Sequence, residues 1–297
     1  MIKLCGTEIK AGHFPDKTQC IRIPLELLEE EEYTIEWKYE GDEELATLLY
    51  ITKHLGDVKK KTLILPYIPN ARMDRVKNSD EVFTLKYFTN IINNLHFDKV
   101  FVLDPHSDVS VALLNNVTVI NPNDYIAKTI QEIKDNNHIE DDKEIIIYFP
   151  DAGAYKRYKD IECLKPYEKI YGQKVRDWNT GKISGLTIVD KDNNIIHGSF
   201  ENNYVLMIDD IISYGGTMYY SALKINEFNP KKIYTYATHV EPKSFWDINK
   251  GTFIKAFGYH NNDGSKNKQI VTKLYTTNSI YNFDENNLII PIPIAIK

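Results

Sequence analysis

Apolar residues gather in five short runs along the chain, and each run ends in or beside polar residues. The runs cover residues 61–67, 99–106, 144–151, 204–210 and 232–239. They are rich in β-forming side chains and alternate little between apolar and polar positions, which is typical of strands covered on both faces of a parallel sheet. We therefore expect each run to be a buried strand.

Helical patterns lie between these runs. Residues 41–55 have acidic side chains in the first turn, basic side chains near the end and apolar residues at helical spacing. Residues 83–97 and 217–228 repeat this spacing. Strands that alternate with helices predict an α/β fold with right-handed crossovers.

A polar segment at residues 133–143, IKDNNHIEDDK, interrupts this alternation near the middle of the chain. Because 297 residues are enough for two cores of ordinary size, we expect two α/β domains, over residues 1–138 and 139–297. A second polar segment, HNNDGSKNK at 260–268, is expected to be a surface loop.

Composition narrows the class of protein. Apolar residues make up 42% of the chain and charged residues 26%, as in ordinary water-soluble domains. The net charge of −6 argues against a nucleic-acid surface. The sequence shows neither an apolar run long enough to span a bilayer nor a stretch typical of a signal peptide. The three cysteines lack metal-ligand spacing, which fits a reduced, cytoplasmic setting. Together with the charge and the apolar pattern, this predicts a cytoplasmic protein without nucleic-acid or membrane partners.

Arginine is rare, since only five of the 36 basic residues are arginines. They are Arg22, Arg72, Arg75, Arg157 and Arg176. The planar guanidinium binds phosphate or carboxylate through two parallel hydrogen bonds, which lysine cannot do. Each arginine is therefore a candidate ligand for an anionic substrate, and the alternative is a structural ion pair.

Three predicted strand ends carry candidate chemistry: LDPHSD (103–108), PDAGAYKR (150–157) and IDDIISYGGT (208–217). Ligands of open parallel sheets bind beyond the carboxyl ends of the strands. Glycines ahead of a helix leave backbone N–H groups for a phosphate, and the paired carboxylates at 209 and 210 can accept hydrogen bonds from sugar hydroxyls or hold a divalent cation. Helix caps and plain turns are the structural alternatives.

IDDIISYGGT resembles the binding motif for 5-phosphoribosyl 1-diphosphate (PRPP) that type I phosphoribosyltransferases share with ribose-phosphate pyrophosphokinases, or PRPP synthetases. Other segments resemble the pyrophosphokinases specifically: HFPDK (13–17), PYIPNARMDR (66–75), LDPHSD, PDAGAYKR, KVR (174–176) and TTNSI (276–280). They occur in the order of that family. The resemblance to the pyrophosphokinase family therefore covers nearly the whole chain.

This resemblance implies a fold and a reaction. The fold would be two tandem type I phosphoribosyltransferase-like domains, each a mostly parallel sheet flanked by helices. The reaction would transfer the β,γ-diphosphoryl group of ATP to the anomeric hydroxyl of ribose 5-phosphate, giving PRPP and AMP, with Mg²⁺ as cofactor. The resemblance also implies a homo-oligomer, either a dimer or a hexamer.

The resemblance further implies roles for particular residues. The catalytic cations would be Lys174 and Arg176. ATP would be bound by Phe14, Asp16, Arg72, Asp74, Arg75 and His106, and magnesium by His106 and Asp151. The ribose and its 5′-phosphate would be bound by Asp209, Asp210, Ser213, Tyr214, Gly215, Gly216 and Thr217. From the residues alone, Lys174 and Arg176 could also form a solvated loop, His106 could be a structural histidine at a strand end, and Phe14 could belong to the core.

Several positions depart from the family pattern. Ser213-Tyr214 stand where the family has Asp-Thr, Met73 replaces a glutamine, Lys17-Thr18 replace Gly-Glu, and Ala152 replaces a histidine. The aromatic ring at position 214 opens an alternative, in which the 5′-phosphate of the acceptor carries a further group. ADP-ribose would be such an acceptor, as in phage-type relatives in NAD salvage that act in the host cytoplasm, and the product would be ADP-ribose 1-diphosphate.

Two other functions remain open. One is a phosphoribosyltransferase that consumes PRPP, and the other is a catalytically silent subunit. The ARMDR and KVR segments argue against the first function. The presence of the implied catalytic and metal-binding residues argues against the second.

Overall fold

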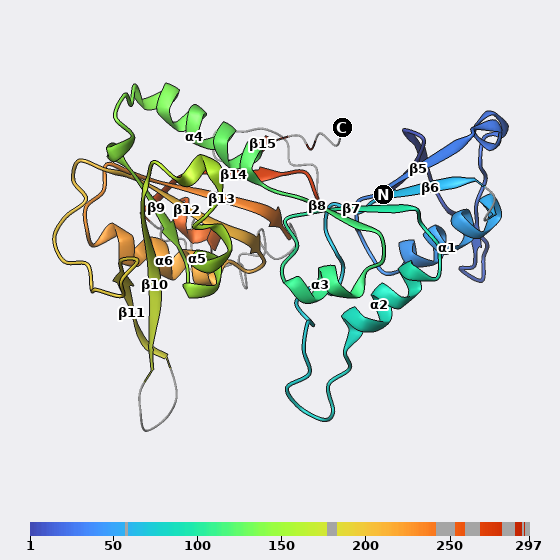
Figure 1. Ribbon diagram of the computed structural model, residues 1–297, viewed down its shortest axis with the longest axis horizontal. Helices are drawn as coiled ribbons and strands as arrows, with labels where there is room; N and C mark the ends of the chain where they lie inside the picture. The colour runs from blue at the N-terminus through green and yellow to red at the C-terminus, as the bar shows by residue number, and fades with distance from the viewer. Residues whose placement is uncertain are drawn as a thin grey trace. The chain divides into compact units, whose positions relative to one another are not determined.

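The computed structural model describes residues 1–56, 59–176, 183–241, 253–258, 268–280, 289–292 and 294, without the side chains of residues 174–176, 183 and 184. The chain forms two compact units, Met1–Asn121 and Pro122–Lys297 (Figure 1). Among the described helices, none combines the length and the apolar character that a membrane crossing requires.

The first unit is built on a six-stranded sheet with the strand order β2-β1-β5-β6-β7-β8. Its strands are β1 (Ile2–Leu4), β2 (Thr7–Ile9), β5 (Glu32–Trp37), β6 (Lys60–Ile64), β7 (Lys99–Leu103) and β8 (Val117–Ile120). The strands from β5 to β8 are parallel, and β1 and β2 are added antiparallel at one side. A separate hairpin consists of β3 (Gly12–His13) and β4 (Gln19–Cys20).

Helices of the first unit pack on this sheet, and those over residues 43–55 and 84–93 do so through apolar stripes that the sequence predicts. They are α1 (Glu43–Leu55), α2 (Thr84–Asn93) and α3 (Asp108–Leu113), with a short 3-10 helix, η1 (Leu25–Glu29). Leu48 of α1 and Leu85 of α2 are fully buried in the same core as Trp37 of β5. Burying each large apolar side chain contributes about 1.5–3 kcal/mol, so this stripe holds the helices on the sheet.

The second unit has a seven-stranded sheet with the order β11-β10-β9-β12-β13-β14-β15. Its strands are β9 (Ile145–Phe149), β10 (Glu168–Arg176), β11 (Ile183–Val189), β12 (Tyr204–Ile212), β13 (Lys232–Val240), β14 (Val271–Thr277) and β15 (Ile289–Ile292). All pairs are parallel except β10 with β11. The helices are α4 (Asn123–Asn137), α5 (Ala152–Tyr158) and α6 (Gly216–Asn226), and the 3-10 helices are η2 (Asp142–Glu144), η3 (Glu162–Leu164) and η4 (Phe253–Ala256).

Helices cover both faces of this second sheet. Tyr148 lies opposite Met207 in the register and Tyr234 lies opposite Leu206, so these two tyrosines point to opposite faces. The hydroxyl of Tyr148 donates to Ser221 Oγ of α6 at 3.0 Å, whereas the hydroxyl of Tyr234 accepts from Asn137 Nδ2 of α4 at 2.9 Å. The α/β fold with mostly parallel, helix-flanked sheets is therefore confirmed.

The division between the units differs from the predicted boundary between residues 138 and 139. It falls between Asn121 and Pro122 because α4 packs on the second sheet. Besides the contact with Tyr234, Oδ1 of Asn123 accepts from the backbone N–H of Cys163 at 3.0 Å. The polar segment 133–143 therefore ends α4 within the second unit and does not separate the units. The predicted loop at 260–268 lies outside the described residues except for Lys268.

Candidate active site

In the first unit, two of the predicted binding segments follow neighbouring parallel strands. β6 and β7 are paired, and the chain continues beyond them with hydrogen bonds from Leu65 N to Phe101 O at 2.8 Å and from Leu103 N to Pro66 O at 3.1 Å. Residues 66–75 and 103–108 therefore leave the same edge of the sheet, where ligands of parallel sheets bind. The structure thus brings the segment with Arg72 and Arg75 to the same edge as the segment with His106.

The arginine-bearing segment makes a turn outside the sheet. Asn70 has a left-handed backbone (φ 62°), and its carbonyl accepts from Met73 N at 2.8 Å. Arg72 and Arg75 are exposed, and Nε of Arg75 lies 3.8 Å from Oδ1 of Asp74. Because 74% of the Arg75 side chain is exposed, water screens this ion pair, and the guanidinium can rearrange to bind an anion.

His106 is half-buried at the end of β7. The chain reaches it through Asp104, which is buried, has a positive φ of 43° and donates its N–H to Ile120 O at 3.1 Å. This bend turns residues 105–108 out of the strand direction before α3 begins. His106 makes contacts within the protein, so both the structural role and the ligand role are compatible with its position.

Phe14 and Asp16 lie at the tip of the β3–β4 hairpin. The Phe14 side chain is 55% exposed, so the alternative that placed it in the core is wrong. Oδ1 of Asp16 accepts from Thr18 Oγ1 at 2.7 Å and from Thr18 N at 3.0 Å, and these hydrogen bonds lower the pKa of Asp16. Lys17 has a φ of 70°, which explains why a glycine suits this position in the family pattern.

In the second unit, Asp151 comes directly after β9 and caps α5. Its Oδ1 accepts from Gly153 N at 2.9 Å and from Ala154 N at 3.0 Å. The capping role that the sequence allowed is therefore present. The cap occupies one carboxylate oxygen in these hydrogen bonds, so Oδ2 is the oxygen that the described contacts leave for a ligand.

Asp209 and Asp210 lie on β12, which pairs directly with β9. Burial, and then the charge of Asp210, raise the pKa of Asp209 well above its usual range, with a smaller contribution from Asp151. The Asp210 carboxylate instead forms an ion pair with Arg157 of α5, with Oδ2 at 3.2 Å from Nη1. The structure therefore brings three predicted carboxylates to one sheet edge and adds an arginine.

Replacing Asp209 by asparagine is expected to stabilise the chain at neutral pH. The raised pKa means that the folded state favours the protonated carboxyl, whereas the unfolded chain ionises near the usual value. Stability is thus lost as the pH rises from the unfolded pKa toward the folded one, and a neutral side chain avoids this loss. The melting temperature of Asp209→Asn should exceed that of the unchanged chain by an amount that grows from about pH 4 to about pH 8. A difference that does not grow with pH would contradict this cause.

The loop between β12 and α6 has the geometry of an anion site. Gly215 has a φ of 69°, and the 11-residue helix α6 begins at Gly216, so that the N–H groups of its first turn point out of the loop. Ser213 is half-buried, Thr217 is exposed, and Tyr214 is 46% exposed. The carbonyl of Tyr214 accepts from Phe253 N at 3.2 Å, and this hydrogen bond ties the loop to η4.

A cavity of about 800 Å³ adjoins this loop. Its lining includes Gly216, Thr217 and Tyr220 of α6, together with Pro150 and Leu186. Tyr220 is 62% exposed. A group attached beyond a phosphate at the first turn of α6 would therefore meet an aromatic and apolar surface.

Lys174 and Arg176 lie in the last part of β10 and pair with β11, at Leu186 and Ile183 respectively. The backbone of this segment is therefore a strand up to Arg176, and it pairs antiparallel with β11. The side chains of Lys174 and Arg176 lie outside the described residues, so their catalytic roles stay predictions.

The comparisons with known proteins agree with this arrangement. No family model matches the chain. A protein from Saccharolobus solfataricus named ribose-phosphate pyrophosphokinase is 30% identical over 233 residues, which are 76% of this chain and 74% of that protein. The chain belongs to the ribose-phosphate pyrophosphokinase family. A protein of the same name from Sulfurisphaera tokodaii is 28% identical over 237 residues, covering 78% of this chain and 76% of its own length.

A solved structure shares the fold of the pyrophosphokinase chain. The phosphoribosylpyrophosphate synthetase from Mycobacterium smegmatis superposes with a TM-score of 0.67 at 17% identity, covering 96% of this chain and 86% of that chain. Members of the ribose-phosphate pyrophosphokinase family are diphosphotransferases, so this chain is an enzyme of that class.

The pyrophosphokinase family uses ATP and generally depends on magnesium. Mg²⁺ usually keeps several water ligands and is bound by one or two carboxylates together with substrate phosphates. The described residues contain no cluster of three or more His, Cys, Asp or Glu side chains placed to hold a metal. The remaining oxygen of Asp151, at the edge where the first turn of α6 can bind a phosphate, fits an ion held largely by the substrates.

Arg157 adjoins the candidate site, but the sequence pattern assigned it no role. It is the last residue of PDAGAYKR and one of only five arginines, so two signals were present. Its partner could not be inferred, because Asp210 is far away in the sequence and approaches only when α5 folds onto β12. The geometry places Arg157 next to the Asp210 carboxylate at the edge of the second sheet.

Proposed function

We propose that the chain transfers the β,γ-diphosphoryl group of ATP to the anomeric hydroxyl of ribose 5-phosphate, giving PRPP and AMP. The observation that carries this proposal is the edge of the second sheet, where Asp209 and Asp210 precede a glycine loop and the first turn of α6. In a family of ribose-phosphate pyrophosphokinases, this combination suits a sugar diol next to a terminal phosphate.

The acceptor site follows from these groups. The N–H groups of Gly216 and Thr217, with the hydroxyls of Ser213 and Thr217, would bind the 5′-phosphate at the positive end of the helix dipole. Asp209 and Asp210 would bind the ribose hydroxyls. Arg157 holds the Asp210 carboxylate in place through its ion pair at 3.2 Å. The sugar is thereby oriented before the diphosphoryl group arrives.

ATP would be bound by residues of the first unit. Arg72 and Arg75 would bind its phosphates, Asp74 would hold their segment, and Phe14 would stack on adenine with Asp16 nearby. This role fits the exposure of both arginines and of the Phe14 ring. His106 and Asp151 would hold Mg²⁺, which neutralises phosphate charge and polarises the phosphoryl group when it is bound.

Diphosphoryl transfer depends on alignment and on charge stabilisation more than on covalent chemistry. Lys174 and Arg176 would supply positive charge to the transferred group, as the resemblance implies. Their backbone at the end of β10 belongs to the same sheet as β9 and β12, which carry the three carboxylates. This common sheet supports a role for the β10–β11 hairpin next to the acceptor.

A second candidate acceptor is ADP-ribose, with the same chemistry and ADP-ribose 1-diphosphate as the product. Two observations favour it: Tyr214 is 46% exposed at the phosphate loop, and the cavity of about 800 Å³ begins at Gly216 and Thr217. An adenosine attached through a second phosphate could stack on Tyr214 or enter this cavity. We also propose a cytoplasmic homo-oligomer, a dimer or a hexamer, on the ground of the family resemblance and the composition of the chain.

The proposal is tested with the purified chain, ATP, Mg²⁺ and either sugar. We expect AMP release that requires ribose 5-phosphate, stops when EDTA removes the metal, and yields a product with the mass of PRPP. AMP release from ATP with ADP-ribose, but not with ribose 5-phosphate, would establish the second candidate. Absence of AMP with both sugars would contradict the diphosphotransferase function, and PRPP consumption in the presence of a nucleobase would establish a phosphoribosyltransferase.

A further inference from the structure

The hairpin that carries Phe14 is small and separate from the six-stranded sheet. Its strands β3 and β4 pair through two residue pairs, Gly12 with Cys20 and His13 with Gln19, and no residue in these strands is buried. A two-stranded hairpin is at best marginally stable by itself. Its orientation must therefore come from contacts with the rest of the first unit.

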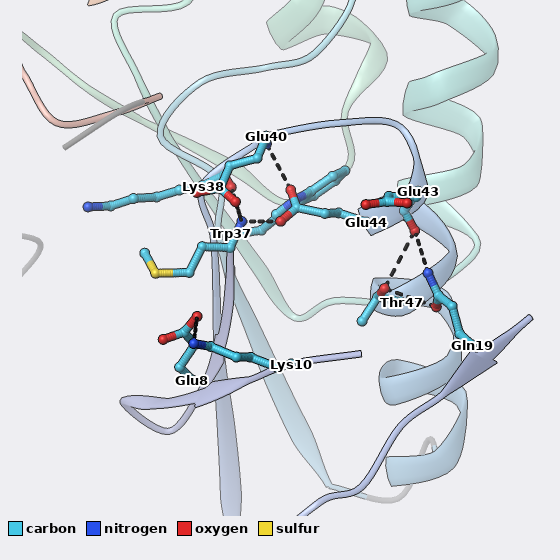
Figure 2. Close-up of polar contacts among 10 residues, drawn as sticks. Glu8, Lys10, Gln19, Trp37, Lys38, Glu40, Glu43, Glu44 and Thr47 are labelled. Atoms are coloured by element: carbon cyan, nitrogen blue, oxygen red, sulfur yellow. Dashed lines mark hydrogen bonds and ion pairs between the residues drawn. The ribbon is translucent and has the colours of Figure 1, made fainter. Parts of the chain in front are cut away.

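The side chain of Gln19 makes such a contact with helix α1 (Figure 2). Its Nε2 donates to the backbone oxygen of Glu43 at 3.1 Å, and its Oε1 accepts from Thr47 Oγ1 at 3.0 Å. Glu43 and Thr47 are one helical turn apart, so the amide is bound at both of its ends. Two hydrogen bonds to one rigid helix fix the plane of the amide and, with it, the course of β4.

Packing does not replace this contact. A hollow of about 310 Å³ adjoins the hairpin and α1, and its lining includes His13, Gln19, Glu43 and Thr47. Thr47 itself is buried, with 4% of its surface exposed, so its hydroxyl has a fixed position. The Gln19 amide therefore joins a small hairpin without buried residues to a helix of the main core.

We propose that Gln19 is a positioning residue for ATP, which holds the β3–β4 hairpin so that Phe14 and Asp16 meet the adenine. This proposal rests on the proposed function for the identity of the ligand. The clamp itself is independent of that function, since it joins only Gln19, Glu43 and Thr47. Neither Gln19 nor Thr47 belongs to the segments that resemble the family motifs.

The test compares Gln19→Leu and Thr47→Val with the unchanged chain. Each variant removes hydrogen bonds at nearly constant volume, and we expect the KM for ATP to rise about five- to tenfold, with kcat and the KM for ribose 5-phosphate changed little. The double variant should be no worse than Gln19→Leu, because both changes break the same clamp. Thr47→Ser keeps the hydroxyl and should restore the KM for ATP.

A second measurement needs no activity. Hydrogen exchange at residues 14–18 should be faster in Gln19→Leu than in the unchanged chain. The matched control is Gln131→Leu, which removes a glutamine hydrogen bond to Asp135 on α4 and should alter neither measurement. Unchanged exchange, or equal rises in the KM values of both substrates, would overturn the proposal. Faster exchange in a chain without AMP release would contradict the proposed function and leave the clamp established.

Discussion

Replacing Gly215 by alanine is expected to destabilise the second unit by about 2–5 kcal/mol and to weaken ribose 5-phosphate binding severely. Gly215 has a φ of 69°, where an L side chain is strained, and an added Cβ would lie 2.2 Å from Cβ of Phe253. Backbone strain and steric overlap therefore act at the same residue. The loop would have to move, and the N–H groups of α6 would move with it.

Gly216→Ala is the matched control for this change. Its added Cβ would meet no atom within 4 Å and its φ is not in the left-handed region. Alanine also keeps the N–H group that would bind the phosphate in the proposed site. Denaturant midpoints and the KM for ribose 5-phosphate would be measured for both variants. Equal effects of the two substitutions would show that strain at residue 215 does not determine the loop geometry.

Arg157→Met is expected to cost about 3 kcal/mol of stability and to raise the KM for ribose 5-phosphate. The side chains of Arg157 and Asp210 are 28% and 7% exposed, so water replaces the guanidinium only partly when it is removed. Asp210 would be left with an incompletely compensated charge at the proposed sugar site. Arg157→Lys should have a stability and a KM between those of the unchanged chain and Arg157→Met, because lysine restores the charge but not the planar guanidinium.

An exposed ion pair provides the comparison for Arg157. Nζ of Lys165 lies 2.5 Å from Oε2 of Glu162, but the side chains of Lys165 and Glu162 are 61% and 76% exposed. Lys165→Met should therefore change stability by less than about 1 kcal/mol and leave both KM values unchanged. If the two methionine variants unfolded at the same denaturant concentration, the ion pair of Arg157 with Asp210 would contribute no more to stability than the exposed pair.

Most of the architecture could be predicted because burial leaves a clear pattern. The run at 144–151 became β9, and the helical spacing at 41–55 became α1, since each depends on which residues face the core. The rule that ligands bind at the carboxyl ends of parallel strands also placed Asp151 beside Asp209 correctly. These predictions need only local periodicity and the direction of the chain.

The rest depends on contacts between residues that are distant in sequence. The pairing of Arg157 with Asp210 required α5 to fold onto β12, and the assignment of α4 to the second unit required its contact with Tyr234. The exposure of Phe14 could not be predicted either, because an aromatic residue in a short polar hairpin fits a core or a ligand surface equally well. In each case the decisive information is tertiary.

The contact between Phe253 and the loop that joins β12 to α6 affects when this loop can take its folded geometry during synthesis. The ribosome produces the chain from its N-terminus, so Gly215 and α6 emerge well before Phe253, which packs against Gly215. A nascent chain that ends before η4 has the loop sequence but lacks Phe253, which packs against the loop. The loop geometry that the proposed phosphate site needs is thus acquired late, once Phe253 has left the exit tunnel and packed against Gly215.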